Sequence, residues 1–395
     1  MSNVVVITSN LYRPHIGGVE NSLYHLAESY KVKGFKPVIV TSDIPLDKGH
    51  LESYEVQNGI EIYRYSMSKR VKFLAIPVPK LLSDLYSAVQ MYRMINSKYK
   101  PVLTITRYHF NQVAVKLAGI PNSVYLVPGV VKFQNSRKNL GSSSISNTLQ
   151  HYYHRILQYW ALKTSDRIAV FSTNMIKQVN SIVKLLDFPI VTKPGVDKSR
   201  FFPASRAQKL IDRKQLDLEF DGPVFLCVGR CVKVKGFDIV IRALQYSEID
   251  NYQLWIIGDG PLQADLQNLA NETGVFDRVK FLGSQSEPEL YYRMADYFLM
   301  SSIYEPLGQT ILEALSSGLP VVAFDKNTGV ETATHELLNL NHGYFMSSTN
   351  EYDVAKFIDF ILQKGNVEYD YKSKACTELA KERYSWDILA DDLME

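Results

Sequence analysis

Two series of short apolar runs, each run followed by a longer polar or amphipathic segment, constrain how this 395-residue chain can fold. The first series occupies 4–8, 37–42, 60–65, 101–106, 123–128, 167–172 and 189–195, and the second occupies 223–229, 252–260, 279–283, 295–302, 319–324 and 343–346. Apolar, β-branched runs that alternate with helical segments are typical of parallel strands covered by helices on both faces. We therefore expect two doubly wound α/β domains, whose ligands bind outside the carboxyl ends of the strands, in a cleft where the domains face each other.

The boundary between the two series falls in the polar segment DKSRFFPASR, residues 197–206. We expect a first domain over 1–200 and a second over 201–383. The last segment, 384–395, has the pattern of a short amphipathic helix, which we expect to pack back on the first domain.

Composition favours a cytoplasmic globular protein. No apolar run approaches the ~20 residues that span a bilayer, and the N-terminal sequence MSNVVVITSN lacks the basic segment of a signal peptide. Three cysteines, an odd and sparse number, fit a reducing compartment. Cys227 and Cys231 have no histidine nearby in the sequence, so we expect no metal site.

Charge is distributed unevenly between the two halves of the chain. Residues 1–200 hold 26 Lys/Arg and 11 Asp/Glu, whereas residues 201–395 hold 18 and 30. No acidic residue occurs between Asp84 and Asp166. A basic half and an acidic half indicate different partners for each half.

Glycines and cations follow the first strand of each series. Gly17 and Gly18 precede a predicted helix, whose N-terminus offers N–H groups to an anion; a plain tight turn is the alternative. The pattern is not Gly-x-Gly-x-x-Gly, so it does not predict a dinucleotide site. Arg230 and Lys235 follow the strand at 223–229 and suit a diphosphate, although a solvated basic loop has the same composition.

Two glutamates flank the start of a predicted helix in SSIYEPLGQTILEALSSGLPVVAF, residues 301–324. Glu305 lies in the loop before this helix, which we expect to begin near Gly308 and to end at Gly318. Glu313 lies two turns inside, in an otherwise apolar pattern. One carboxylate at each side of a helix N-terminus suits a nucleotide-diphosphate sugar. Glu305 would accept from sugar hydroxyls, the N–H groups of the helix would bind the diphosphate, and Glu313 would accept from the ribose diol. The alternative is that Glu305 only complements the helix dipole with its negative charge and that Glu313 is a surface residue without a ligand.

These motifs together resemble the retaining nucleotide-sugar glycosyltransferases of family 4, which have the two-domain GT-B fold. The resemblance covers almost the whole chain and rests on PHIGGVE, KPGVDKSRF, VGRCVKVKG, GDGP, FLG and EPLGQTILEALSSGLPVV, in this order. The Gly-Arg-x4-Lys-Gly and Glu-x7-Glu patterns are its most specific parts.

The resemblance implies a role for each matching position. Arg230 and Lys235 would neutralise the departing diphosphate, so that neither a catalytic metal nor another cofactor is needed, and Glu305 would hold hydroxyls of the donor sugar. Glu313 would bind the ribose. Further donor contacts are implied at Gly17, Gly18, Leu307, Gly308 and Gln309. The anomeric configuration would be retained, the departing phosphate taking the acceptor's proton.

The chain departs from the family at one position. Members often carry a histidine after the strand at 123–128, where this chain has Pro128. Arg107 or His109, after the preceding strand, could supply that contact, and we place both of them, with Glu20, on the acceptor side.

The expected function is transfer of a hexose from a UDP- or GDP-sugar to a membrane-linked oligosaccharide or lipid in cell-surface polysaccharide synthesis. The basic first half, with 68–82, 132–141 and 149–163 as its basic and aromatic segments, would dock on the anionic cytoplasmic face of the membrane. Alternatives are a soluble transferase acting on a small sugar and a catalytically silent nucleotide-sugar binding protein. The basic residues form no recognised nucleic-acid motif, so nucleic acid is not an expected partner.

Overall fold

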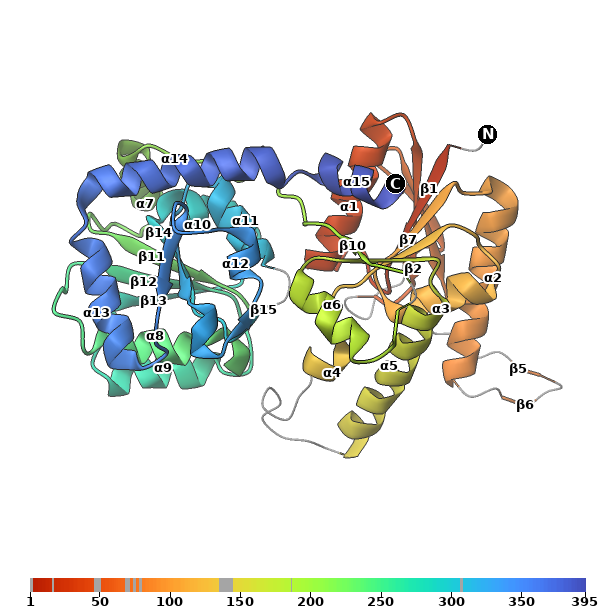
Figure 1. Cartoon of the computed structure of the whole chain (residues 1–395), viewed down its shortest axis with the longest axis horizontal. Helices are drawn as coiled ribbons and strands as arrows, with labels where there is room; N and C mark the ends of the chain where they lie inside the picture. The colour runs from red at the N-terminus through yellow and green to blue at the C-terminus, as the bar shows by residue number, and fades with distance from the viewer. Residues whose placement is uncertain are drawn as a thin grey trace. The chain divides into compact units, whose positions relative to one another are not determined.

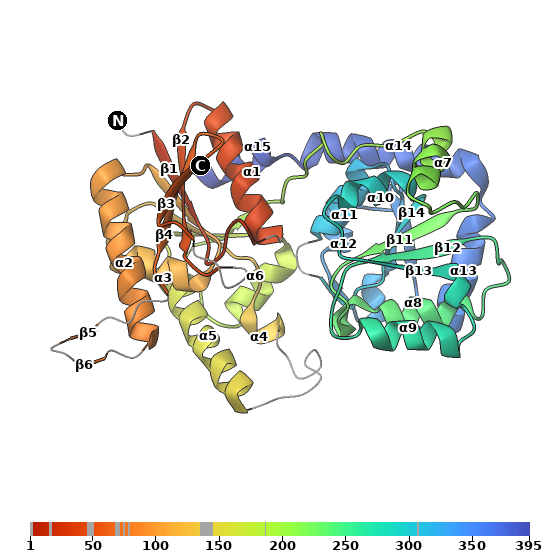
Figure 2. The same cartoon turned by 180° about the vertical axis from the view of Figure 1, so that it is seen from behind.

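The structure is a computed structural model that describes residues 3–15, 18–45, 51–67, 72–73, 76–77, 80–134, 145–185, 187–305 and 308–395. The chain divides into two compact units. Unit 1 comprises Met1–Gly195 and Trp386–Glu395, and unit 2 comprises Val196–Ser385. Figures 1 and 2 show the elements of each unit from opposite sides.

Unit 1 is built on an eight-stranded sheet with the order β10-β9-β8-β7-β1-β2-β4-β3. Its strands are β1 Val4–Thr8, β2 Lys36–Ser42, β3 Tyr54–Gln57, β4 Ile60–Tyr65, β7 Leu103–Thr106, β8 Ser123–Leu126, β9 Arg167–Val170 and β10 Ile190–Val191. Its helices are α1 Gly18–Val32, α2 Lys80–Tyr99, α3 His109–Leu117, α4 Val131–Gln134, α5 Ile145–Thr164, α6 Thr173–Asn180 and α15 Trp386–Met394. A separate two-stranded pair joins β5 Lys72–Phe73 and β6 Ile76–Pro77.

The strands of this sheet are parallel, with one exception that the sequence reading missed. Strand β3 runs antiparallel to β4 at the sheet edge, and the two are joined by Asn58 and Gly59. Both turn residues have positive φ, 53° and 77°, as a tight two-residue hairpin turn requires. The expectation of an all-parallel sheet is therefore wrong at this edge.

The C-terminal helix α15 packs on α1 inside unit 1. The Tyr30 hydroxyl donates to the carbonyl of Ala390 at 2.8 Å, and Lys33 pairs with Asp391 at 2.8 Å. The chain therefore leaves unit 1 after β10 and returns to it for its last helix (Figure 1).

Unit 2 contains a six-stranded parallel sheet with the order β13-β12-β11-β14-β16-β18. Its strands are β11 Val224–Val228, β12 Gln253–Ile257, β13 Val279–Gly283, β14 Tyr297–Met300, β16 Val321–Phe324 and β18 Gly343–Met346, and a small separate pair joins β15 Tyr304–Glu305 to β17 Glu331–Thr332. Its helices are α7 Arg206–Gln215, α8 Phe237–Leu244, α9 Gln263–Glu272, α10 Pro288–Met294, α11 Gln309–Ser316, α12 Thr334–Leu337, α13 Glu351–Leu362 and α14 Gly365–Arg383.

Helices cover both faces of this sheet, because alternate residues of each strand enter different cores. Phe225 and Cys227 of β11 pack with α8, α9 and α13, whereas Leu226 packs with α10, α11 and α14 on the opposite face. Read in chain order, the strands are arranged 3-2-1-4-5-6, the doubly wound order, in which the direction of winding reverses between β11 and β14.

Every run expected to be a strand contains one, and the predicted helix after Glu305 is α11, preceded by Gly308. The expectation of doubly wound α/β domains is thus confirmed. Among the described helices, none combines the length and apolarity needed to cross a membrane.

Candidate active site

The reversal point of unit 2 brings together two side chains that the sequence predicted for one ligand. Lys235 ends the short helical turn η1 Lys233–Lys235 after β11, and Glu305 lies in β15 after the neighbouring strand β14. The Lys235 ammonium donates to Glu305 Oε2 at 2.6 Å. Both side chains retain about a sixth of their exposure, 17% and 15%. The pair is thus partly buried at the edge of the sheet where ligands of this fold bind.

The loops that follow β11 and β12 touch each other backbone to backbone. Gly258 has a φ of +132°, and a Cβ atom there would lie 2.0 Å from the carbonyl oxygen of Gly229. Cys231 N–H donates to the carbonyl of Asp259 at 2.8 Å. The GDGP turn is therefore required for a close backbone approach beneath the Arg230–Lys235 loop.

The N-terminus of α11 is joined to the Glu305 carboxylate. Gly308 precedes the helix with a φ of +72° in the left-handed region, and its N–H donates to Glu305 Oε1 at 3.3 Å. Glu305 thus accepts from Lys235 with one oxygen and from the helix start with the other. Gln309 is the first residue of the helix, and Leu307 lies outside the described residues.

Glu313 lies deeper in α11 and is held by a different helix. The buried Tyr292 of α10 donates its hydroxyl to Glu313 Oε2 at 2.8 Å. Desolvation raises the pKa of Glu313 to about 7, although the charges of Arg200 and Lys235 oppose this shift. Lys235 therefore acts on both glutamates, by a hydrogen bond to one and by its charge on the other.

Arg230 is the exposed cation of this group. It lies two residues beyond the end of β11, and within the described part of unit 2 no carboxylate forms an ion pair with it. Besides Lys233, which pairs with Asp238, the loop thus holds two cations, and the helix that follows β15 is flanked by two carboxylates. That arrangement can bind a group with both negative charge and hydroxyls.

Unit 1 has its own reversal point, between β1 and β7. Gly18 is the exposed first residue of α1, and Glu20 lies in the first turn of the same helix; Gly17 lies outside the described residues. Arg107 follows β7, is 1% exposed, and donates to the Ser22 hydroxyl at 2.8 Å. Burial lowers the pKa of Arg107 to about 10, and the charge of Glu20 counters this effect.

His109, the other residue considered in place of the missing family histidine, is the first residue of α3 and is buried. Its Nε2 lies 2.9 Å from Nδ1 of His154. Burial and the nearby His154 lower the pKa of His109 to about 3, so the ring is neutral at physiological pH. Pro128 lies just beyond β8 and is partly buried.

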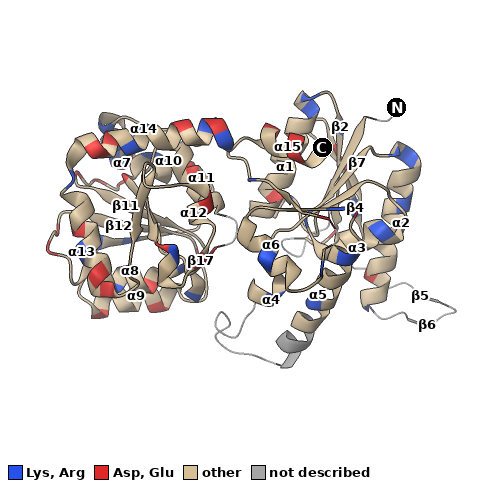
Figure 3. Ribbon diagram, in the orientation of Figure 1, with Lys and Arg blue, Asp and Glu red and all other residues tan. Residues whose placement is uncertain are grey.

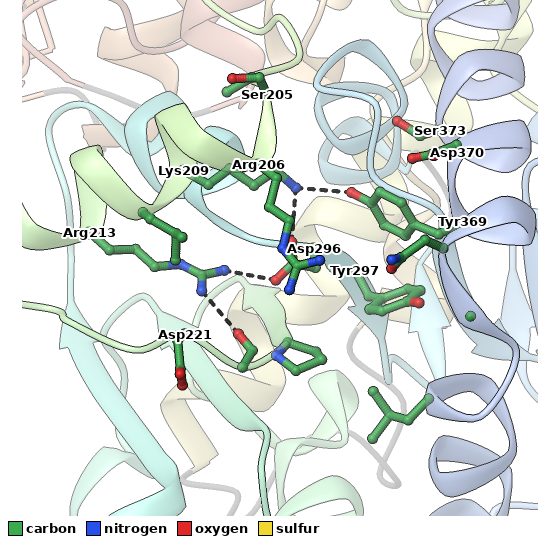
Figure 4. Close-up of a pocket in the computed structure, with 17 residues that line it drawn as sticks. Ser205, Arg206, Lys209, Arg213, Asp221, Asp296, Tyr297, Tyr369, Asp370 and Ser373 are labelled. Atoms are coloured by element: carbon green, nitrogen blue, oxygen red, sulfur yellow. Dashed lines mark hydrogen bonds and ion pairs between the residues drawn. The ribbon is translucent and has the colours of Figure 1, made fainter.

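A buried ion cluster in unit 2 escaped the sequence reading (Figure 4). Lys209 and Arg213 of α7 share the carboxylate of Asp296 at 3.0 and 2.7 Å, beside a pocket of about 410 Å³. Asp296 precedes β14, so the cluster lies at the opposite edge of the sheet from Glu305. Lys209 also donates to the carbonyl of Ala295 and the hydroxyl of Tyr369. Arg213 also donates to three backbone carbonyls, those of Phe220, Gly222 and Met294. The cations are therefore satisfied within the protein, and the cluster fastens α7 to the sheet.

No group of three or more His, Cys, Asp or Glu side chains suited to a metal ion occurs in the described residues. Cys227 and Cys231 are both buried, as expected for Cys227 from its place in a strand.

The doubly wound units, with polar side chains gathered at their reversal points, define the class of the protein as a two-domain GT-B glycosyltransferase fold. The sucrose-phosphate synthase of Thermosynechococcus elongatus is similar over 98% of this chain and 96% of its own, with a TM-score of 0.75 and 21% identity. HepE of Anabaena, in its complex with UDP-glucose, covers 99% and 98% with a TM-score of 0.75 and 16% identity. The expectation of the GT-B fold is confirmed by this likeness.

Residues 208–383 match the family described as glycosyl transferases group 1, so the chain contains a glycosyltransferase group 1 domain. The lipopolysaccharide core biosynthesis glycosyltransferase LpsE of Rhizobium meliloti is 41% identical over 113 residues, 29% of this chain and 33% of its own. A GDP-mannose-dependent phosphatidylinositol monomannoside mannosyltransferase of Mycobacterium tuberculosis is 35% identical over 158 residues, 37% and 40% of the two chains. The chain thus spans little more than a third of the length of these relatives.

Proposed function

We propose that the protein is a retaining, metal-independent glycosyltransferase that moves a hexose from a UDP- or GDP-sugar to a membrane-linked oligosaccharide or lipid. The observation that carries the proposal is the meeting of Lys235 and Glu305 at the reversal point of a group 1 domain. One of these side chains suits phosphate and the other suits sugar hydroxyls, and they are held within one hydrogen bond of each other.

The donor would be held mainly by groups around this pair. Lys235 and the exposed Arg230 take the diphosphate, together with the backbone at Leu307, Gly308 and Gln309. Glu305 accepts hydrogen bonds from hydroxyls of the donor sugar, and Glu313 from the ribose diol. Because Lys235 is hydrogen-bonded to Glu305, donor binding would exchange one partner of each side chain for a donor group.

The transfer needs no protein nucleophile. The bond between the anomeric carbon and the β-phosphate oxygen breaks, and the acceptor hydroxyl oxygen forms the new bond on the same face. Its proton passes to the departing phosphate oxygen, so the products are the glycoside and the nucleoside diphosphate. Arg230 and Lys235 stabilise the negative charge that develops on the leaving group, which is the main electrostatic demand of the step.

The acceptor would be bound by unit 1, with Glu20, Arg107 and His109 near its site. By their descriptions, one of the relatives named above belongs to lipopolysaccharide core biosynthesis and the other is a phosphatidylinositol monomannoside mannosyltransferase. Their descriptions support an acceptor anchored in a membrane, and we place the reaction at the cytoplasmic face.

Thermal unfolding of the full chain with UDP, GDP, ADP, CMP and NAD tests the donor class. A ligand at about 100 times its Kd adds roughly 2.7 kcal/mol of stability, a shift of several degrees. We expect a shift with UDP or GDP that survives EDTA, followed by turnover of the matching nucleotide sugar with retention seen by NMR of the product. A shift with NAD alone, or with none of the five, contradicts the proposal.

A further inference from the structure

One face of helix α5 exposes large apolar side chains to solvent. Tyr152, Ile156 and Trp160 are 55%, 58% and 48% exposed. They recur at every fourth position, so they lie one above another on the same side of the helix. Exposed apolar groups arranged as a continuous stripe, rather than scattered singly, mark an interaction surface.

Cations flank this stripe without any carboxylate to neutralise them. Arg155 lies over the ring of Tyr152 at 5.8 Å, and Lys163 over the ring of Trp160 at 5.4 Å. Lys132 of α4 joins them beside a recess of about 320 Å³ that Arg155 and Ile156 also line. Among the described residues, none of these three cations forms an ion pair, and the described turns of α5 in Figure 3 carry no red of Asp or Glu.

We propose that this surface docks on a bilayer that carries anionic lipid headgroups. We call it the α5 face: Tyr152, Ile156 and Trp160 with Lys132, Arg155 and Lys163. Tyrosine and tryptophan are amphipathic and settle at the boundary between headgroups and acyl chains, while the cations pair with lipid phosphates. Charge complementarity favours this partner, since 81 consecutive residues around α5, from 85 to 165, contain no acid.

The α5 face assigns the membrane contact implied by the proposed function to particular residues, all of which the structure describes. The basic segment 68–82, which the sequence also suggested, lies largely outside the described residues. The biological role of this surface rests on the proposed function. Its binding to lipid does not, because that binding needs neither donor nor acceptor.

Helix α13 of unit 2 supplies a matched control within the same chain. Tyr352 and Phe360 are 52% and 47% exposed, with Lys356 and Lys364 over their rings at 5.5 and 4.3 Å. These aromatic and cationic contacts match those of α5. However, Lys356 pairs with Glu248, and the first turn of α13 carries acidic residues. The two helices therefore differ in net charge rather than in exposed aromatic surface.

The test is flotation of the full chain with phosphatidylcholine vesicles that do or do not contain about one-third phosphatidylglycerol. We expect flotation only with the anionic vesicles. Y152S/I156S/W160S and, separately, K132Q/R155Q/K163Q should lose it, the latter by roughly 100-fold in partition. Y352S/F360S should float like the wild type. The charge variant keeps the test valid if the serine variant does not fold.

Three results would overturn the α5 face as a membrane surface: no flotation of the wild type with anionic vesicles, equal flotation of both triple variants, or a loss in Y352S/F360S as large as theirs. A change of oligomeric state in the serine variant, with lipid binding intact, would instead identify an interface between copies of this chain. Thermal shift with nucleotides, measured on the same samples, tests the donor proposal independently of lipid binding.

Discussion

Lys235 and Glu305 lie 70 positions apart in the chain, and their side chains meet at 2.6 Å. They meet because the strands that precede them, β11 and β14, are neighbours at the reversal point of the sheet. The two side chains form an ion pair with each other. Their pairing holds the phosphate-binding and sugar-binding candidates in place, and it also means that each competes with the ligand for the other.

Replacement of Glu305 by glutamine separates these two effects. We expect turnover to fall by roughly 100- to 1000-fold, since the sugar hydroxyls lose a charged acceptor at the reacting centre. Affinity for the bare nucleoside diphosphate should not fall, because Lys235 is released from its carboxylate partner. Steady-state kinetics and calorimetric titration measure the two quantities. Unchanged turnover in Glu305→Gln would remove Glu305 from the reaction.

Lys235→Met is the complementary change. The diphosphate loses a charge-assisted hydrogen bond, so we expect nucleotide affinity to fall about tenfold or more. Lys233→Met, on the same loop and exposed, serves as the control, because its ammonium pairs with Asp238 rather than Glu305. If both variants bind equally, the loop contributes only general positive charge.

Glu313 makes the stability of the protein depend on pH. Desolvation raises its pKa from 4.5 to about 7, so the folded state holds a proton that the unfolded state has released. Stability is therefore lost as pH rises from about 4.5 through about 7. Glu313→Gln, which cannot ionise and can still accept from Tyr292, should gain on the order of 1–3 kcal/mol over the wild type at about pH 8 and nothing near pH 4. Denaturant unfolding at several pH values gives this difference, and a gain independent of pH would contradict the explanation.

Much of the fold was predictable, because it rests on local patterns. Buried parallel strands are continuous apolar runs, and α11 is bounded by Gly308 and Gly318, both at φ near +70°. Strand β3 was missed because its residues alternate between exposed and half-buried and do not form an apolar run. The Asn58–Gly59 pair that follows it was the available signal, since Asn-Gly strongly favours a hairpin turn.

Motif spacing predicted which residues to consider for the site, but it did not predict their contacts. Motif spacing identified Lys235, Glu305 and Glu313, yet the Tyr292 hydroxyl that holds Glu313 comes from another helix, and no spacing rule connects the two. Asp296 was equally invisible, because its partners on α7 are more than 80 residues away in sequence.

The backbone contact beneath the donor loop predicts a severe effect of Gly258→Ala. The new Cβ would lie 2.0 Å from the Gly229 carbonyl, and only a shift of backbone relieves it. We expect a loss of about 3 kcal/mol or more. Gly329→Ala is the control: its φ is also positive, at +83°, but nothing lies within 4 Å of the added carbon, so the cost is about 1–2 kcal/mol of strain. Equal losses in chemical denaturation would show that the close approach is relieved easily.

The ion cluster at the opposite edge of the unit 2 sheet predicts that a substitution remote from the donor site strongly lowers the stability of the protein. Asp296→Asn keeps the shape of the side chain but leaves Lys209 and Arg213 buried without an anion, and we expect a loss of about 3 kcal/mol. Although desolvation opposes it, the two cations hold the pKa of Asp296 below its usual range. The advantage of the wild type should therefore shrink as pH falls below about 4.

Glu378→Gln is the control for this prediction. It breaks an exposed pair with Lys374 and should cost at most about 0.5 kcal/mol. Nucleotide affinity of folded Asp296→Asn should equal that of the wild type, whereas a parallel loss of affinity would show that the two edges of the sheet are coupled.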